Sequence, residues 1–275
     1  MPAVSIGVPV YNGEDFLDEC LACLAGQTFR DIEVLVWDNA STDRTGDIAR
    51  AWEKRDPRFR YFRQETNRGV WRNFSDVLTA GKSEYFMWRA HDDLSAPDFI
   101  EVLHRLLVEA PNANLAVASL RKTGFDGSPA GKRRVRSLER GPKLARIHRL
   151  VSHYHPSWFY GLWRRQALAD TFNALWSAYP HTLGFDHLTL FGLALDEAIV
   201  GSNVTYFVQR KSRNQYIPSP AKTAQIRGEF ARQVHSMIDR RSMPRCERLV
   251  LHWMALAYVR RFFKRRKLER TPRSA

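Results

Sequence analysis

Two adjacent carboxylates, Asp92 and Asp93, are the residues of this chain whose types and spacing best suit chemistry. They follow a short apolar run, Tyr85–Trp88, inside the segment EYFMWRAHDDLSAPDF at residues 84–99. Neighbouring acids repel each other, so a folded protein keeps them where a cation or hydrogen-bond donors offset the repulsion. Carboxylate oxygens are the ligands that Mg²⁺ and Mn²⁺ prefer. The pair therefore predicts a ligand site, and it can hold a divalent cation.

Alternating strands and helices must position this pair. Buried apolar runs predict strands, and apolar residues at helical spacing between capping residues predict helices. The expected strands are 4–13, 32–43, 58–64, 85–88 and 114–120, and the expected helices are 14–25, 44 to about 54, 70–79 and 97–109. This alternation at short spacing predicts an α/β fold with a parallel, doubly wound sheet and right-handed crossovers.

Polar residues follow three of these strands, as Tyr11-Asn12, Asp38-Asn39 and Asp92-Asp93. Parallel strands place their carboxyl ends at one edge of a sheet, so we expect these side chains to converge. Asp38 can accept a hydrogen bond from a base or ribose, and Tyr11 can stack on a flat ring. Neither the glycine-rich dinucleotide turn nor the P-loop follows the first strand. A nucleotide diphosphate site is predicted, but neither a dehydrogenase nor an NTPase.

The second half of the chain has a less regular pattern. Residues 123–143 are rich in Gly, Pro, Ser and basic residues, which predicts a long loop. Helices are expected at 142–152, 186–195, 225–240 and 247–268, and strands at 157–164 and 200–208. Trp158 and Tyr160 fit either strand packing or the lining of an acceptor sugar site.

The net charge of +14 is concentrated in two segments. Residues 132–149 carry eight Lys and Arg against Glu139, and residues 260–275 carry eight against Glu269, so each segment has a charge of +7. Such segments suggest an anionic partner, namely a membrane surface, a lipid phosphate or nucleic acid. A solvated basic surface without a partner is the alternative.

The C-terminal helix also has two interpretations. Trp253, Tyr258, Phe262 and Phe263 precede or accompany a basic run, as in an amphipathic helix that lies on an anionic membrane. A helix packed on the rest of the protein with a solvated basic end fits equally well. We find no secretory signal and no apolar run near the ~20 residues of a membrane span. The chain is therefore expected in the cytoplasm or peripherally on the inner face of the membrane.

Two clusters of potential metal ligands have simpler explanations. Cys20 and Cys23 have the spacing of half a zinc site, but they fall within a helical apolar pattern without a second pair, which favours core packing. Three cysteines in the chain fit a reducing compartment. His153 and His155 lie two apart on an expected strand face, and ordinary hydrogen bonding is favoured because no third ligand accompanies them.

Six segments, in this order, resemble the family-2 glycosyltransferases of GT-A fold. They are VSIGVPVYNGEDFLDECLACLAGQT, IEVLVWDNASTD, NRGVWRN, EYFMWRAHDDLSAPDF, SWFYGLWRR and GFDHL, and the resemblance covers nearly all of residues 4–215. It implies a GT-A-like, mostly parallel sheet flanked by helices. It further implies a nucleotide-sugar-binding half at 1–122, an acceptor-binding and catalytic-base half at 123–215, and a basic helical extension at 216–275.

The resemblance implies roles for individual residues. The matched positions are Val8, Pro9, Tyr11 and Asp38 for the nucleobase, Asn67 and Arg72 beside the nucleotide, Asp92 for the ribose or phosphate side, Asp93 for the metal, and Asp186 for the catalytic base. Family members often have a further Asp two residues before the pair, where this chain has Ala90. The cation site is therefore expected to be weaker or differently arranged.

The implied activity is an inverting, metal-dependent transfer of a hexosyl group. The donor would be a nucleotide-diphosphate sugar, foremost a UDP-sugar, and the acceptor a saccharide or lipid-linked saccharide in bacterial surface polysaccharide or glycolipid assembly. Asp186 would take the proton from the acceptor hydroxyl, while a cation at Asp93, aided by Arg72 or Arg213, would stabilise the leaving diphosphate. From spacing alone, Asp186 fits equally well as a helix N-terminal carboxylate facing the helix dipole.

Two other classes of protein remain as alternatives. Ala90 is compatible with a non-catalytic homologue that binds sugar nucleotides. The basic loop and tail are compatible with a nucleic-acid-binding protein. The chain has no recognised nucleic-acid-binding module, and acids at the strand ends would repel a phosphate backbone. Nucleic acid is therefore not expected as a partner.

Overall fold

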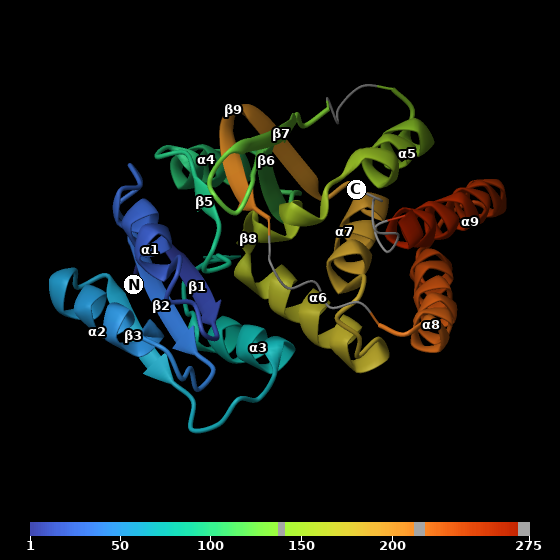
Figure 1. Cartoon of the computed structure of the whole chain (residues 1–275). Helices are drawn as coiled ribbons and strands as arrows, with labels where there is room; N and C mark the ends of the chain where they lie inside the picture. The colour runs from blue at the N-terminus through green and yellow to red at the C-terminus, as the bar shows by residue number, and fades with distance from the viewer. Residues whose placement is uncertain (137–140, 212–217, 269–275) are drawn as a thin grey trace. The chain divides into compact units, whose positions relative to one another are not determined.

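The chain folds into two compact units that interleave along the sequence (Figure 1). The computed structural model describes residues 1–136, 141–211 and 218–268, with residues 265–268 described by their backbone alone. Unit 1 comprises Met1–Arg136, Ser157–Thr171 and Ala198–Asn214, and unit 2 comprises Ser137–Pro156, Phe172–Glu197 and Gln215–Ala275. The division expected after residues 122 and 215 therefore differs from the compact units, because residues 157–171 and 198–214 return to unit 1.

Unit 1 is built on a nine-stranded sheet in the described part of the chain. The strand order is β3-β2-β1-β4-β8-β6-β9-β5, and β7 pairs with β6 beside this path. The strands are β1 (Val4–Val10), β2 (Ile32–Asp38), β3 (Phe59–Arg63), β4 (Tyr85–Trp88), β5 (Leu94–Ser95), β6 (Leu115–Thr123), β7 (Pro129–Arg133), β8 (Leu162–Arg164) and β9 (Ile199–Arg210).

The first four strands in this order pair in parallel, as the sequence predicted. Val10 pairs with Asp38 and Gly7 with Trp88, so the carboxyl ends of β1, β2 and β4 lie at one edge. Beyond β4 the sheet is mixed. The β6–β9 pairing is parallel, whereas β8 runs antiparallel to β4 and β6, and β5 runs antiparallel to β9.

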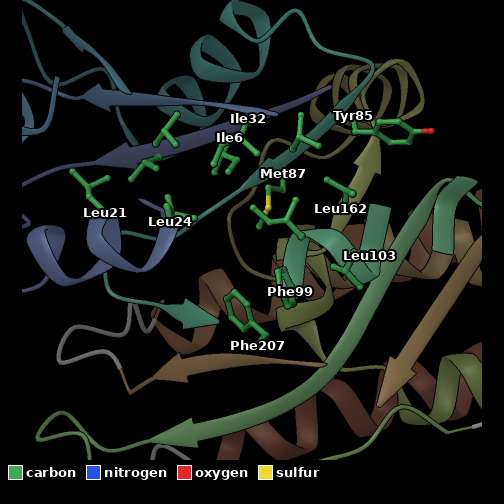
Figure 2. Packing of buried hydrophobic residues seen from close by; sticks show 14 of the residues in the cluster. Ile6, Leu21, Leu24, Ile32, Tyr85, Met87, Phe99, Leu103, Leu162 and Phe207 are labelled. Atoms are coloured by element: carbon green, nitrogen blue, oxygen red, sulfur yellow. The ribbon is translucent and has the colours of Figure 1, made fainter. Parts of the chain in front are cut away.

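Helices cover both faces of the parallel strands. They are α1 (Leu17–Ala25), α2 (Thr45–Arg55), α3 (Val70–Ala80) and α4 (Phe99–Glu109). Leu21 and Leu24 of α1 and Leu103 of α4 pack in one apolar cluster with Ile6 and Met87, as Figure 2 shows. The opposite face receives α3. A Cβ on Gly7 would lie 2.9 Å from Val77 of α3, so only glycine permits this close approach of helix and strand.

Residues 157–164 do not form the expected strand. Pro156–Tyr160 form a 3₁₀ helix, η1, and only Leu162–Arg164 join the sheet as β8. The prediction was wrong because a short aromatic run is equally apolar in either conformation. Gly161 allows the change of direction, since a Cβ there would lie 2.3 Å from the carbonyl oxygen of Ala116.

Residues 123–143 are not one long loop. Pro129–Arg133 pair antiparallel with β6 as the exposed strand β7. The strand escaped prediction because Gly, Pro and basic residues have low strand propensity, and main-chain pairing with β6 forms it nevertheless. A helix at Arg165–Ala178, α6, and the two-residue strand β5 were also not predicted.

The helices of unit 2 include α5 (Lys143–His153), α7 (Phe185–Leu195), α8 (Pro220–Asp239) and α9 (Arg245–Leu268). The last two begin earlier than predicted. Ser219 caps α8 by accepting the amide N–H of Lys222 at 3.2 Å, and Pro220 suits its first turn. Within the described residues, no helix has the length and apolar character needed to cross a membrane.

Helix α9 packs within unit 2 along one side. Its buried residues are Leu251, Ala255, Tyr258, Val259, Phe262 and Phe263, and α9 contacts both α5 and α8. Of the two interpretations of the C-terminal helix, packing on the rest of the protein is therefore correct for this side of α9. A second side of α9 carries exposed apolar residues and is considered below.

Candidate active site

A cavity of about 550 Å³ lies in unit 1 where β1, β2 and β4 end. Tyr11 follows β1, Asn39 follows β2, and Asp92 and Asp93 follow β4 by a short turn. The cavity is also lined by Pro9, Val10, Asn67, Val70, Asn73, Phe74, Ala90, His91, Tyr160, Gln209 and Arg210. The structure thus gathers polar side chains from three strand ends, as expected for parallel strands.

Asp93 is the most enclosed acid of the cavity, with 3% of its surface exposed. Its Oδ1 accepts the backbone N–H of Arg210 at 2.9 Å. Burial, and then the negative charge of Asp92, raise the pKa of Asp93 well above its usual range. A hydrogen bond from the Arg210 backbone and the charges of Arg89 and Arg210 oppose this rise. A carboxylate so enclosed needs further positive charge to stay ionised.

Arg89 brings a cation close to this acid from within the core. Its side chain is fully buried, and Nη2 donates to Ser95 Oγ at 2.9 Å. The guanidinium lies over the rings of Phe99 and Phe207, at 5.6 and 5.1 Å from their centroids. Aromatic faces partly replace the lost hydration of such a buried cation.

Arg210 is the cavity-lining cation that the sequence did not single out. It ends β9, whose antiparallel pairing with β5 brings the main chain of Arg210 to Asp93. Its guanidinium lies over the ring of Phe16 at 4.2 Å and is ion-paired with Glu19 at 2.7 Å. Its position two residues after the expected strand 200–208 was the available signal, by the same rule that identified Asp92.

Of the two arginines expected to assist the leaving group, the structure describes Arg72. Arg72 lies on α3, and its Nε is 3.3 Å from Oδ1 of Asp76 one turn later on the same helix. Its side chain is 59% exposed and is not among the residues that line the cavity. Arg213 lies outside the described residues. Arg210 is therefore the arginine that the described part of the chain brings to this cavity.

Tyr11 is available to a flat ligand, because 46% of its surface is exposed at the cavity. Pro9 also lines the cavity, whereas the side chain of Val8 is fully buried in the core. Val8 therefore contributes to the packing of β1 and is not among the residues that line the cavity. Tyr160 reaches the cavity from η1 and stacks on Phe207 with their centroids 5.9 Å apart, while Trp158 is buried.

Three asparagines form one wall of the cavity. Asn39 donates from Nδ2 to Oδ1 of Asn67 at 2.9 Å, which helps to hold the Asn67 side chain at the cavity. Asn73 donates from Nδ2 to the carbonyl of Trp37 at 3.0 Å. Its Oδ1 is buried without a hydrogen-bond partner in the described part of the chain. A bound ligand with an N–H or O–H group would find an acceptor there.

Asp38, for which a contact with a base or ribose was expected, is not among the residues that line this cavity. It is fully buried, and Oδ1 accepts the backbone N–H of Ser41 at 2.8 Å. Oδ2 accepts Tyr61 Oη at 2.7 Å and Arg63 Nη1 at 2.8 Å. The neighbouring strand β3 supplies these two donors, so sequence spacing could not show that the carboxylate was already occupied.

We expect Asp38→Ala to destabilise unit 1 by about 3 kcal/mol, because each buried donor left without an acceptor costs roughly 1–3 kcal/mol and Arg63 can reach water. Urea unfolding of the variant would measure this loss. Asp38→Asn, which keeps the shape and part of the hydrogen bonding, should lose less. Wild-type stability together with lost nucleotide affinity would instead indicate that Asp38 contacts the ligand.

Ala90 and His91 lie in the cavity wall directly before the acidic pair. Burial lowers the pKa of His91, against the opposing charges of Asp92 and Asp43, which favours a neutral imidazole. No group of three or more His, Cys, Asp or Glu side chains that could hold a metal ion occurs in residues 1–136, 141–211 and 218–264.

For Cys20, Cys23 and His153 the sequence favoured packing or hydrogen bonding over metal binding, and the structure shows such contacts. Cys20 and Cys23 lie in α1, where their Sγ atoms contact the carbonyl oxygens of Ala90 and Ser95. This is packing, as favoured from the sequence. His153 ends α5 and is not on a strand, and its Nδ1 contacts the carbonyl of Arg149 at 2.9 Å.

Asp186 belongs to unit 2, in the first turn of α7. Gly184 precedes it with a φ of 86°, a left-handed conformation that favours glycine. The carboxylate Oδ1 of Asp186 accepts the backbone N–H of His187 at 2.8 Å. Asp186 is half-buried.

Two solved structures have folds similar to that of this chain. The S. aureus TarS 1–349 structure in complex with UDP-GlcNAc superposes with a TM-score of 0.68 at 18% identity, over 93% of this chain and 72% of that one. The mannosyltransferase PcManGT from Pyrobaculum calidifontis, in complex with GDP-Man and Mn²⁺, gives 0.55 at 16% identity, over 98% and 76%. The fold of this chain is that of the GT-A glycosyltransferases.

The family model for glycosyl transferase family 2 matches residues 5–172, and the chain belongs to this family. Glycosyltransferase GlyA of Streptococcus pneumoniae is 33% identical over 42% of this chain and 16% of its own length. The putative glycosyltransferase EpsH of Bacillus subtilis is 36% identical over 38% and 30%. The matched region thus spans well under half of the length of each of these relatives. Asp186 lies beyond residue 172, so only the resemblance of GFDHL carries its assignment.

Proposed function

We propose that this chain is an inverting hexosyltransferase that uses a nucleotide-diphosphate sugar, with UDP-sugars as first candidates. The cavity at the strand ends carries this proposal, because it combines an exposed ring at Tyr11 with the acids Asp92 and Asp93 and the cation Arg210. A nucleobase can stack on the ring of Tyr11, and a diphosphate needs positive charge such as that of Arg210. TarS binds UDP-GlcNAc and PcManGT binds GDP-Man, so both bases belong in a test.

Calorimetric titration with UDP and GDP, each with Mn²⁺, tests the donor class. Binding of one nucleoside diphosphate with 1:1 stoichiometry is expected. Replacing Tyr11 by alanine should weaken it by about 10- to 100-fold, since stacking on an aromatic ring contributes roughly 1–3 kcal/mol. The absence of binding by either nucleotide would contradict the proposal.

The residues at Asp93 fit a divalent cation. One or two carboxylates suffice for Mg²⁺ or Mn²⁺ when phosphate oxygens complete the coordination, and Asp93 and Asp92 supply such a set. The burial of Asp93 also disfavours an uncompensated negative charge. When bound, the cation would supply positive charge for the diphosphate leaving group. The guanidinium of Arg210 takes the supporting role first expected of Arg72 or Arg213.

For Asp186 we propose the role of general base toward the acceptor hydroxyl. The carboxylate would remove the hydroxyl proton as the acceptor oxygen attacks the anomeric carbon and the nucleoside diphosphate departs. The acceptor is proposed to be a saccharide or lipid-linked saccharide in bacterial surface polysaccharide or glycolipid assembly. For Asp38 we propose a structural role in place of a contact with the base. Its hydrogen bond to the backbone N–H of Ser41 would hold the turn that contains Asn39.

A non-catalytic sugar-nucleotide binder is the second candidate, favoured by Ala90 in the cavity wall. Such a protein would bind UDP or GDP but release none from any donor sugar. A nucleic-acid-binding protein would show tight, salt-sensitive binding of DNA or RNA without nucleotide affinity. The titration above, combined with a turnover assay, separates these outcomes from the enzyme.

We also propose that the protein acts on the cytoplasmic face of a membrane and contacts it through α9. Leu249, Trp253 and Leu256 are 70%, 72% and 49% exposed, and their spacing places them along one side of the helix. Arg260 and Lys264 follow and are exposed. Apolar anchors beside basic residues suit the interface of an anionic bilayer.

Replacing Trp253 by serine should reduce binding to anionic vesicles at least about tenfold, because burial of a large apolar side chain contributes roughly 1.5–3 kcal/mol. Flotation with phosphatidylglycerol vesicles measures this, and Val204→Ser, which alters an exposed valine of β9, is the control. Point variants are preferable to removal of α9, whose Tyr258 and Phe262 are buried in unit 2. Equal flotation of wild type and Trp253→Ser would contradict the proposal.

A further inference from the structure

Aromatic side chains of α8 and α9 enclose the turn that leads into α7. A Cβ on Gly184 would lie 2.8 Å from the ring of Phe230 and 3.2 Å from that of Phe262. These two rings stack at 4.8 Å, and Phe262 lies 4.5 Å from the imidazole of His187. The backbone beside Asp186 is therefore held by side chains from the C-terminal helices.

Two buried tyrosines converge on the residue that follows Asp186. Tyr154 Oη donates to the carbonyl oxygen of His187 at 3.0 Å. Tyr258 Oη lies 3.3 Å from Nδ1 and 3.4 Å from the carbonyl oxygen of the same histidine. The two phenol groups also hydrogen-bond to each other. Tyr154 follows the end of α5 and Tyr258 lies on α9. Two segments far apart in the sequence therefore contact the same residue, His187.

His187 links these phenols to the carboxylate. Its carbonyl accepts from Tyr154, while its N–H donates to Oδ1 of Asp186. Burial, together with the nearby charge of Asp186, raises the pKa of both tyrosines, so they remain neutral hydrogen-bonding groups. The phenols can fix the main chain of His187 without adding charge beside the carboxylate.

We propose that Tyr154 and Tyr258 are positioning residues that hold the carboxylate of Asp186 through His187, which makes α9 part of the acceptor-activating machinery. This inference rests on the proposed role of Asp186 as base. It gives the C-terminal extension a task in the reaction in addition to the proposed membrane contact. The hydroxyls, more than the rings, carry the effect, so Tyr→Phe variants isolate it.

Tyr258→Phe should lower kcat by about 10- to 100-fold, because displacement of a reacting group by an ångström can cost 100-fold. The affinity for UDP or GDP, measured with Mn²⁺ by calorimetry, should not change, since the nucleotide cavity lies in unit 1. Leu251→Val is the matched control. It is a small change of another buried side chain of α9, and kcat should not fall.

A double-mutant cycle with Asp186→Asn distinguishes positioning from general destabilisation. If Tyr258 acts through Asp186, Tyr258→Phe costs nothing further in turnover once Asp186 is asparagine. The inference would be overturned if the double variant lost kcat by the product of the two single-variant losses. Full turnover of Tyr258→Phe with Asp186 intact would overturn it as well. Full turnover of Asp186→Asn alone would remove the base assignment and this inference with it.

Hydrogen exchange of the peptide 184–190, followed by mass spectrometry, gives a readout without any donor or acceptor. Amides of the first turn of α7 should exchange at least about tenfold faster in Tyr258→Phe than in wild type, because local opening governs exchange. Leu251→Val should not accelerate them. Unchanged exchange in Tyr258→Phe would overturn the proposed positioning, whatever the activity assay gives.

Discussion

Replacing Asp93 by asparagine is expected to reduce cation-dependent nucleoside diphosphate binding at least about 100-fold. Even groups that only orient metal ligands contribute 10- to 100-fold to metal affinity, and Asp93 is proposed as a ligand itself. Asparagine keeps an oxygen that can accept the N–H of Arg210, so the turn at the strand end should survive. The substitution is intended to remove the negative charge of Asp93 while keeping the shape of its side chain.

Calorimetry of UDP or GDP binding, with Mn²⁺ and with EDTA, measures this effect. Wild type should bind more tightly with the cation, whereas Asp93→Asn should bind equally weakly under both conditions. Asp98→Asn is a suitable control, because Asp98 accepts a hydrogen bond from Thr205 at 2.7 Å and does not line the cavity. A cation effect of unchanged size in Asp93→Asn would place the metal elsewhere.

Replacing Asp186 by asparagine is expected to lower kcat by about 10²- to 10⁴-fold, the usual contribution of a general base. Nucleotide binding should be unaffected, because Asp186 belongs to unit 2 and the cavity to unit 1. An asparagine side chain can still accept the N–H of His187 but cannot take a proton from a hydroxyl. The loss should therefore appear in turnover alone.

Steady-state rates of nucleoside diphosphate release at saturating donor measure this loss. Asp196→Asn serves as control, since Asp196 lies at the other end of α7 and is ion-paired with Arg241. Its turnover should stay near that of wild type. A weakened donor affinity with unchanged kcat in Asp186→Asn would assign the residue to donor binding instead.

The parallel half of the sheet could be predicted because its signals are local. Val4–Val10 and Ile32–Asp38 are mostly apolar segments with polar residues at or directly after their carboxyl ends, and the structure places both as adjacent parallel strands. The edge at which Asp92 and Asp93 lie follows from the same geometry. Composition and order thus sufficed to predict which edge of the sheet carries these polar side chains.

Interactions between distant segments could not be predicted. Asp38 resembles a free carboxylate at a strand end until β3 places Tyr61 and Arg63 on it. Arg210 reaches the cavity because β9 pairs with the two-residue strand β5, which no periodicity marks. Local spacing indicates which end of a strand a residue occupies, but not which partners come from other strands.

Helix α9 shows a further limit of sequence patterns. Tyr258 and Phe262 are buried, while Trp253 and Leu256 are exposed, although all four are large and apolar. An amphipathic pattern separates apolar from polar sides, but here two sides are apolar. Only the packing of α5 and α8 against α9 distinguishes the side that supports α7 from the side proposed for a membrane.

Release of nucleoside diphosphate from a panel of UDP- and GDP-sugars tests the central claim most directly. The assay would use Mn²⁺, Mg²⁺ or EDTA and supply saccharide and lipid-linked saccharide acceptors. We predict turnover of at least one donor, abolished by EDTA and severely reduced in both Asp93→Asn and Asp186→Asn. Nucleotide binding without turnover of any donor, or turnover that survives both substitutions, would contradict the proposed glycosyltransferase mechanism.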